Sequence, residues 1–356
     1  MRISPDTRDQ TDPLFIQSVP QRGIVVHMTH DFVAIGDTTV DEFIKLKEAE
    51  VHCDIDSENC TISMKWGDKI PFEFSVLVPA VGNAANAAVA AARLGLKTAF
   101  VSNVGNDRYG EETIGTFKRE GVDTTFVRIN DGIPTNHHYV LWYGAERTIL
   151  IKHEKYPYAI PESFEAPRWI YLSSAGEESE AFHLALAKWL ALHPETKLAF
   201  QPGTFQMKMG KEKLKDLYAH TELVACNKEE AQRILEITES DIKVLLENMR
   251  ELGPKVALIT DGPHGSYAYD GSRMLYVPMF PDPKPPVDRT GAGDACTATI
   301  AAALALGLPL EEALLWGPIN SMSVVQEIGA QKGLLSKVQI EEWLSKRPAE
   351  YKPTVL

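Results

Sequence analysis

The sequence predicts an α/β protein in which helices flank both faces of a central, mostly parallel sheet, with a small β-sheet attached to it. Two observations predict this fold. From residue 83 onward, helical and strand-like segments alternate, which is typical of parallel βαβ units. Between residues 42 and 78, short alternating apolar and polar segments are separated by turn residues, which indicates a small sheet inserted after the first strand.

The first half of the chain begins with the apolar strand 31–37, which ends in a glycine turn. An Ala-rich helix follows from Asn83 to Leu94, and the next helix ends at Gly121, a residue suited to a left-handed cap. Further strands are expected at 61–66, 71–76, 98–104, 136–142 and 147–151, and a helix at 107–120. Several of these short strands belong to the small sheet.

The second half repeats the alternation and closes with helices. Helices are expected at 178–191, 211–218, 228–236 and 241–252, and strands at 197–201, 222–226 and 255–260. Strands at 265–269 and 274–277 surround Asp270-Gly271, which favours a tight hairpin turn. After a Pro-rich connector at 281–286, helices are expected at 292–306, 310–325 and 336–346.

These elements divide the chain into three parts. Residues 1–30 form an N-terminal extension. The large α/β domain comprises 31–41, 79–123 and 152–356, and the small sheet comprises 42–78 and 124–151.

Composition excludes several classes of protein. The 356 residues carry 36 basic and 49 acidic side chains, a net charge of −13, which argues against nucleic-acid binding. No run of about 18 apolar residues predicts a membrane span, and the start lacks the apolar region of a signal peptide, so we expect a cytoplasmic protein. Four scattered cysteines, Cys53, Cys60, Cys226 and Cys296, predict reduced thiols and no zinc site.

The most informative segment is Asp288-Arg-Thr-Gly291-Ala292-Gly293-Asp294, which opens an Ala-rich helix. Glycines let backbone N–H groups approach an anion, and the helix N-terminus adds partial positive charge, so this segment predicts a phosphate cradle. Asp294 beside it would accept a proton from a hydroxyl that attacks a γ-phosphate. An ordinary helix start with an acidic first turn is the structural alternative.

Two other segments add polar residues at helix starts. Asn83 and Asn86 lie three residues apart after Gly82 and can face one ligand, or they serve as an N-cap and a core amide. Asn227 and Glu230 follow a strand, where the carboxylate can hold a water on Mg²⁺ or the pair can form a capping box.

Together these segments resemble the ribokinase-like (PfkB-type) carbohydrate kinases over residues 31–345. The resemblance implies ATP and Mg²⁺ as cofactors, in some members also K⁺, and a small β-sheet that acts as a lid over the sugar and often pairs between subunits. It implies that Asp294 is the catalytic base, with Gly291, Ala292 and Gly293 as the anion hole. The remaining roles implied are substrate contacts at Thr39, Asp41, Gly82, Asn83 and Asn86; nucleotide contacts at Asn227, Thr260, Gly262 and Gly265; Mg²⁺ through water at Glu230; and a monovalent cation at Asp288.

Departures from the family pattern argue against ribose as the substrate. Val81-Gly82 replaces the usual Gly-Gly, and a serine, Ser173 or Ser174, replaces a sugar-binding glutamate. A phosphorylated sugar would require basic groups in the lid, where the candidates are Arg147, Lys152, His137 and His138. Exposed charge at a strand edge is the ordinary interpretation of those residues.

The sequence therefore predicts a kinase that phosphorylates a sugar or sugar-like alcohol and forms a homodimer through the lid. A nucleoside kinase is the alternative, with a base stacked on Trp66, Phe72, Tyr139 or Trp142, and a sensor without turnover is another. A dinucleotide-dependent dehydrogenase is disfavoured because no G-x-G-x-x-G follows the first strand.

Overall fold

A ten-stranded sheet forms the centre of the molecule in the computed structural model, which describes residues 30–53, 60–144 and 146–356. The strand order is β16-β15-β14-β13-β12-β11-β10-β1-β6-β7. Seven strands are parallel: β1 (Phe32–Ile35), β6 (Thr98–Gly105), β7 (Val127–Asn130), β10 (Trp169–Leu172), β11 (Lys197–Phe200), β12 (Thr221–Asn227) and β13 (Val256–Thr260). An antiparallel edge follows in β14 (Ser266–Tyr269), β15 (Met274–Val277) and β16 (Thr354–Val355). The prediction of a mostly parallel sheet is confirmed.

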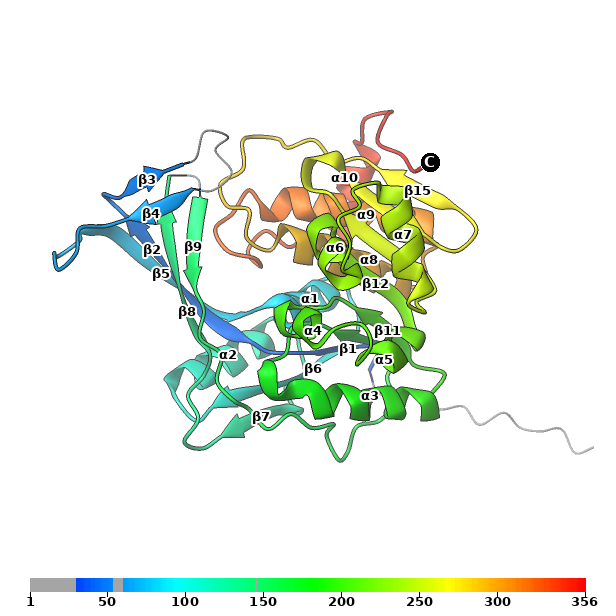
Figure 1. Ribbon diagram of the computed structural model, residues 1–356, viewed down its shortest axis with the longest axis horizontal. Coiled ribbons are helices and arrows are strands. Elements are labelled where there is room, and N and C mark those ends of the chain that lie inside the picture. Colours follow the sequence, from blue (N-terminus) through cyan, green and yellow to red (C-terminus); the bar gives the residue numbers. More distant parts are fainter. Residues whose placement is uncertain (1–29, 54–59, 145) are drawn as a thin grey trace, which may run out of the picture.

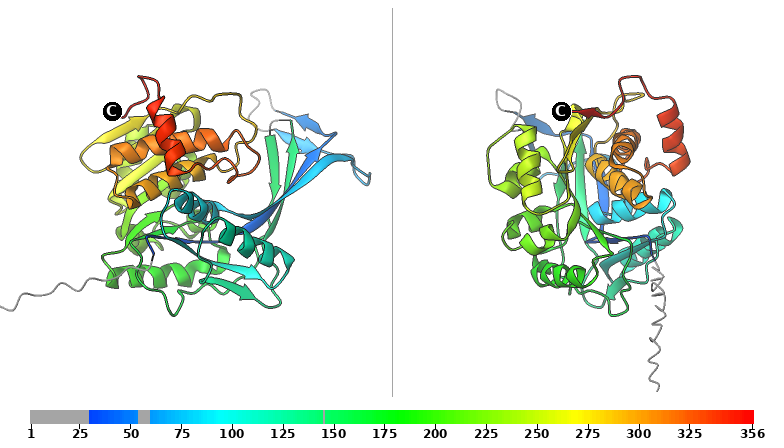
Figure 2. Two further views of the ribbon diagram at one scale, coloured as in Figure 1. Left: turned by 180° about the vertical axis from the view of Figure 1, so that it is seen from behind. Right: turned by 90° about the vertical axis from the view of Figure 1, so that its right-hand side faces the viewer.

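Helices cover both faces of this sheet (Figure 2), as the sequence predicts. One face carries α1 (Asn83–Arg93), α2 (Arg108–Arg119), α8 (Ala292–Ala305), α9 (Leu310–Val324) and α10 (Lys337–Ser345). The other carries α3 (Glu180–Leu192), α4 (Thr204–Met209), α5 (Lys215–Ala219), α6 (Lys228–Leu235) and α7 (Ile242–Glu251). Each face buries its own hydrophobic core because a helix between two parallel strands must cover the sheet.

Small residues allow the two helices that matter most for the site, α1 and α8, to pack directly on each other. Both are built largely from alanines that are fully buried, so their backbones approach closely. The start of α1 therefore lies beside the start of α8, although the two are about 200 residues apart in sequence, as the contact between positions 86 and 294 shows.

The small sheet projects from one side of the large one (Figure 1) and has the order β5-β2-β8-β9. We call these four strands the lid sheet: β2 (Thr39–Leu46), β5 (Phe72–Val81), β8 (His137–Tyr143) and β9 (Glu146–Leu150). A separate pair, β3 (Glu50–His52) and β4 (Thr61–Ser63), extends from it. The expectation of a small separate sheet is confirmed.

Several boundaries differ from those expected. Strand β7, within the 124–151 range assigned to the lid, instead pairs in parallel with β6 and widens the large sheet. The helix expected at 211–218 begins later, at Lys215, and α4 was not expected. The extension predicted at 1–30 lies outside the described residues except for His30. Among the described residues, no helix is both long enough and apolar enough to cross a bilayer.

The prediction of four reduced cysteines is wrong for one pair. Cys53 and Cys60 form a disulfide, whereas Cys226 and Cys296 are free and buried. The cause is the antiparallel pairing of β3 with β4, in which His52 lies opposite Thr61 and places the two neighbouring cysteines face to face. The cytoplasmic location stays a prediction.

Candidate active site

Asp294 lies in the first turn of α8, where two side-chain amides hold its carboxylate. Asn86 Nδ2 donates to Asp294 Oδ2 over 2.9 Å, and Gln201 Nε2 donates to Oδ1 over 3.1 Å. Burial raises the pKa of Asp294 above the ordinary value of 3.8, while these two donors act in the opposite direction. A carboxylate of raised pKa binds a proton more strongly, which suits the role of a general base.

A second layer of hydrogen bonds fixes the two amides. Gln331 Nε2 donates to Asn86 Oδ1 over 3.0 Å and to the backbone oxygen of Ala80 over 2.6 Å. Tyr171 donates its hydroxyl to Gln201 Oε1 over 2.6 Å. Each amide oxygen is thus occupied by a donor, so each NH₂ group must point at Asp294. Asn86 is the buried, satisfied amide that the sequence offered as an alternative, yet its partner is the candidate base.

Neither Gln201 nor Gln331 was identified from the sequence. Gln201 follows β11 at the carboxyl end of a parallel strand, where α/β proteins place ligand-binding residues, so its position carried a usable signal. Gln331 lies in a loop between α9 and α10, and its partners are about 250 residues away in sequence. No local pattern indicates that contact.

The amide donors predict a measurable pH effect. In Gln201→Leu, the carboxylate loses one donor that lowers its pKa, so the pKa of Asp294 rises further. The base must be ionised to act, so the acid limb of the kcat/KM profile moves to higher pH. Turnover measured from pH 4 to 9 with saturating nucleotide checks this shift, and an unchanged or lower acid limb would contradict it.

The predicted anion hole lies at the start of α8. Gly291 caps the helix with a left-handed φ of 76°, and an added Cβ there would overlap Ala330. Ala292 and Gly293 begin the first turn, whose N–H groups have no partner within the helix. These groups and the helix dipole therefore favour an anion next to Asp294.

A cavity of about 450 Å³ opens beside this helix start and joins the predicted nucleotide residues to the anion hole. Thr260, Gly262 and Gly265, around the short 3₁₀ turn Gly262–His264, line it together with Ala292 and Gly293. The sequence did not identify the rest of its wall, which comes from the 3₁₀ turn and β14, from the Pro-rich connector and its flanks, and from α8 and the end of α9: Pro263, Ser266, Met279, Phe280, Pro281, Asp282, Pro286, Arg289, Cys296, Ser321 and Val325.

Asn227 and Glu230 form the capping box that the sequence gave as their alternative role. Asn227 Oδ1 accepts from the Glu230 backbone N–H over 2.8 Å, and Glu230 Oε2 accepts from the Asn227 N–H over 2.9 Å. Burial raises the pKa of Glu230, and the negative charge of Asp294 raises it further. The negative charges of the two carboxylates therefore repel each other.

Asp41 lies on the lid sheet and is 8% exposed. Its Oδ1 lies 3.4 Å from His138 Nδ1, on the neighbouring strand β8. Within the described residues, Asp41 Oδ1 and His138 Nε2 are both buried without a hydrogen bond. Unpaired buried polar atoms are unusual in folded proteins, so these two atoms indicate a place for a polar ligand.

The other predicted substrate residues lie on β2 and at the start of α1. The Thr39 hydroxyl donates to the backbone oxygen of Asn136 over 3.2 Å, so its hydrogen is already used. Gly82 caps α1 at a φ of 116°, where an added Cβ would lie 3.0 Å from the Asp37 carbonyl oxygen. Asn83 is the first residue of α1 and not its cap.

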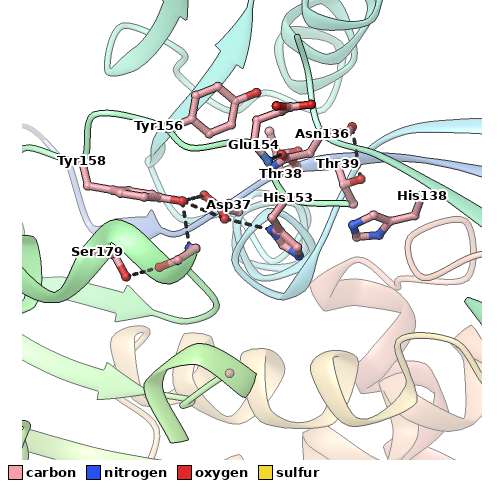
Figure 3. Close-up of polar contacts among 12 residues, drawn as sticks. Asp37, Thr38, Thr39, Asn136, His138, His153, Glu154, Tyr156, Tyr158 and Ser179 are labelled. Carbon is pink, nitrogen blue, oxygen red and sulfur yellow. Dashed lines mark hydrogen bonds and ion pairs between the residues drawn. The ribbon is translucent and has the colours of Figure 1, made fainter. Parts of the chain in front are cut away.

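A buried carboxylate that the sequence did not single out, Asp37, lies near these residues (Figure 3). The Tyr158 hydroxyl lies 2.8 and 2.9 Å from its two oxygens, and His153 Nδ1 lies 3.2 Å from Oδ2. Burial, followed by the charge of Asp37, raises the pKa of Tyr158 strongly, so the phenol stays protonated. His153 in turn packs against His138, with ring centroids 5.2 Å apart. This cluster connects the end of β1 with the pair Asp41 and His138.

Asp288 precedes the anion hole by three residues and is 6% exposed. Its Oδ1 lies 2.6 Å from Nη1 of Arg147, which extends from strand β9 of the lid sheet. The Arg147 side chain is 18% exposed, so it is not the free strand-edge charge that the sequence allowed.

The chain is similar to several known proteins. Residues 72–337 match the family model of the pfkB family carbohydrate kinases. The chain belongs to this family. It is 28% identical over 277 residues to a ribokinase of Bacillus subtilis, covering 74% of this chain and 87% of that protein. It is also 26% identical over 286 residues to a nucleoside kinase of Methanocaldococcus jannaschii, covering 74% and 85%.

Solved structures show the same fold. The Arabidopsis thaliana ribokinase in complex with ribose and ATP matches with a TM-score of 0.73 and 22% identity, over 89% of this chain and 99% of that one. The Methanocaldococcus jannaschii nucleoside kinase matches with a TM-score of 0.72 and 20% identity, over 89% and 98%. The pfkB chain is therefore a sugar or nucleoside kinase with the ribokinase fold.

Proposed function

We propose that this kinase transfers the γ-phosphate of ATP to a hydroxyl of a sugar or sugar-like alcohol, with Asp294 as the general base. The observation that supports this proposal most strongly is the position of Asp294. Its carboxylate stands at the start of α8, accepts a hydrogen bond from the amide of Asn86, and belongs to the residue directly after Gly293, which lines the cavity. A nucleotide on one side and an acceptor hydroxyl on the other would meet at that carboxylate.

Different residues have different roles in this phosphoryl transfer. Asp41 and Asn86 orient the acceptor, which brings its hydroxyl close to the phosphate and reduces the entropic cost of reaction. Asp294 accepts the hydroxyl proton as the new O–P bond forms. The N–H groups at Gly291, Ala292 and Gly293 stabilise the negative charge on the transferring phosphoryl group. Closure of the lid sheet would exclude water and limit ATP hydrolysis.

The residues present also fit the cofactors. The cavity beside α8 has walls from Thr260, Gly262 and Gly265. We propose that it takes ATP and that Asn227, which pairs with Thr260 on the neighbouring strand, contacts the phosphates. Mg²⁺ in kinases is bound by one or two carboxylates, by waters and by phosphates, and the half-buried Glu230 would supply such a carboxylate through water. The ion supplies charge neutralisation on the β- and γ-phosphates when it is bound.

A nucleoside is the second candidate acceptor, and one aromatic residue favours it. In the parallel pairing of β2 with β8, Asp41 lies opposite His138 and Lys45 opposite Trp142, so these four side chains share one face of the lid sheet. Tyr139 lies opposite Glu42 on the other face, and Trp66 is 99% exposed outside the strands. Of the aromatic residues predicted to stack on a base, Trp142 therefore lies on the same face of the lid sheet as Asp41 and His138.

The experiment that tests the proposed function measures ADP release from Mg-ATP with free sugars, keto-deoxy sugar acids, sugar phosphates and nucleosides. Turnover with one acceptor class, lost in Asp294→Asn, is the expected result. Turnover with nucleosides that Trp142→Ala abolishes would select the second candidate. ATP binding without turnover on any acceptor would overturn the kinase proposal and favour a sensor.

We propose that the lid sheet also forms a homodimer interface. Its outer strands expose Phe72 and Phe74 on β5 and Ile149 and Leu150 on β9, each at least 39% accessible. An edge with exposed apolar residues is a site for pairing with a second copy. We expect the wild type to elute as a dimer and Phe72→Glu/Phe74→Glu as a monomer, measured by size exclusion with light scattering. Leu192→Glu, at a 78% exposed residue of α3, is the control and is expected to stay dimeric.

A further inference from the structure

The carboxylate of Asp288 is surrounded by hydrogen-bond donors. Its Oδ1 accepts from the backbone N–H of Thr290 over 2.9 Å and from the Thr290 hydroxyl over 2.7 Å, in addition to the Arg147 guanidinium. Its Oδ2 accepts from the Gly329 N–H over 2.9 Å. These four contacts use both oxygens and come from three separate segments of the chain.

This environment does not fit the monovalent cation that the family resemblance implies at Asp288. A hard cation requires oxygen ligands that point lone pairs at it, whereas the groups around this carboxylate point N–H and O–H hydrogens at it. The guanidinium of Arg147 already balances the negative charge of Asp288. A second cation would therefore meet repulsion from Arg147 without an uncompensated negative charge to offset it.

Arg147 comes from a different part of the fold than the loop it contacts. Its strand β9 pairs with β8, in which Trp142 lies opposite Arg147, so the arginine is anchored in the lid sheet. Asp288 and Gly329 belong to two loops that meet beside the anion hole, where Val287 and Asp288 also donate to the Val325 carbonyl. The ion pair thus connects the lid sheet to the segment that sets the position of Gly291.

We infer that Arg147 takes over the role of the monovalent cation, so that the lid sheet orders the anion hole and the kinase does not depend on K⁺. Arg147 is a positioning residue in this scheme, because it acts on the anion hole through Asp288. A planar guanidinium suits this role, since it forms directed hydrogen bonds to a carboxylate while it keeps its charge. The inference rests on the proposed function for its effect on turnover.

The first test compares K⁺ with a bulky organic cation. For the wild type, we expect the same kcat, within twofold, in potassium chloride and in choline chloride at equal ionic strength. In choline chloride, we expect Arg147→Ala to lose about 10- to 100-fold in kcat, the range for losing a group that orients a catalytic site. Added K⁺ or guanidinium chloride is expected to restore part of this loss, and Arg147→Lys is expected to be intermediate. Arg108→Ala removes an exposed ion pair with Glu112 and serves as the control with unchanged kcat.

A second readout requires no acceptor and so separates this inference from the proposed function. The melting temperature of the wild type is expected to be equal in the two salts, whereas that of Arg147→Ala is expected to be higher in potassium chloride than in choline chloride. Activation or stabilisation of the wild type by K⁺ would overturn the inference. Wild-type kcat for Arg147→Ala in choline chloride would overturn it as well, and if no acceptor supports turnover, the melting temperatures alone decide.

Discussion

Asp294→Asn is expected to reduce kcat by about 10²- to 10⁴-fold, the contribution typical of a general base. The substitution keeps the size of the side chain and replaces the basic carboxylate with an amide that does not take up the hydroxyl proton. Because the cavity for the nucleotide is lined by Thr260, Gly293 and their neighbours and not by Asp294, we expect ATP binding to persist. Initial rates of ADP release and calorimetric titration with ATP measure the two quantities separately.

A matched acid-to-amide change supplies the control for this experiment. Asp216→Asn alters an exposed carboxylate on α5, on the opposite face of the large sheet, and is expected to leave both rate and ATP affinity unchanged. Turnover of Asp294→Asn within threefold of the wild type would show that another group accepts the proton. A loss of ATP affinity equal to the loss of rate would assign Asp294 to nucleotide binding and not to the base role.

Gly291→Ala is expected to lower kcat by about 10²-fold because it displaces the anion hole. An added Cβ would overlap the side chain of Ala330 and come within 2.7 Å of its Cα. The left-handed φ of 76° adds a backbone cost of about 1–2 kcal/mol for any residue other than glycine. The loops at Gly291 and Ala330 must therefore separate, and the first N–H groups of α8 move with them.

Gly307→Ala separates the effect of the Cβ overlap from the effect of the left-handed backbone conformation. Gly307 lies just past the other end of α8 at a positive φ of 89°, and an added Cβ there meets nothing within 4 Å. This variant should lose about 1–2 kcal/mol of unfolding free energy through its backbone conformation while kcat stays at the wild-type value. Thermal denaturation and steady-state kinetics of both variants measure the difference, and equal kcat for Gly291→Ala and the wild type would exclude a tight fit at the anion hole.

The sequence by itself determined the order of the elements and the position of the main motif. Three features are local patterns: the alternation of helix and strand after residue 83, the small strands between 42 and 78, and the glycine turn before Asp294. Each can be predicted from residues that are close together in the sequence. The capping box at Asn227 and Glu230 was also legible, because its two partners lie three residues apart.

The tertiary structure alone decided which side chains meet around these motifs. Gln201 donates to Asp294, and Gln331 holds the Asn86 amide that also donates to it. Tyr158 and His153 surround Asp37, and Arg147 reaches Asp288 from the lid sheet. The partners in these contacts lie between about 90 and 250 residues apart in sequence. Hydrophobic periodicity and helix caps depend on residues only a few positions apart in the sequence. A buried polar group instead bonds to a partner that tertiary packing places beside it, here the packing of the two sheets and of α1 on α8.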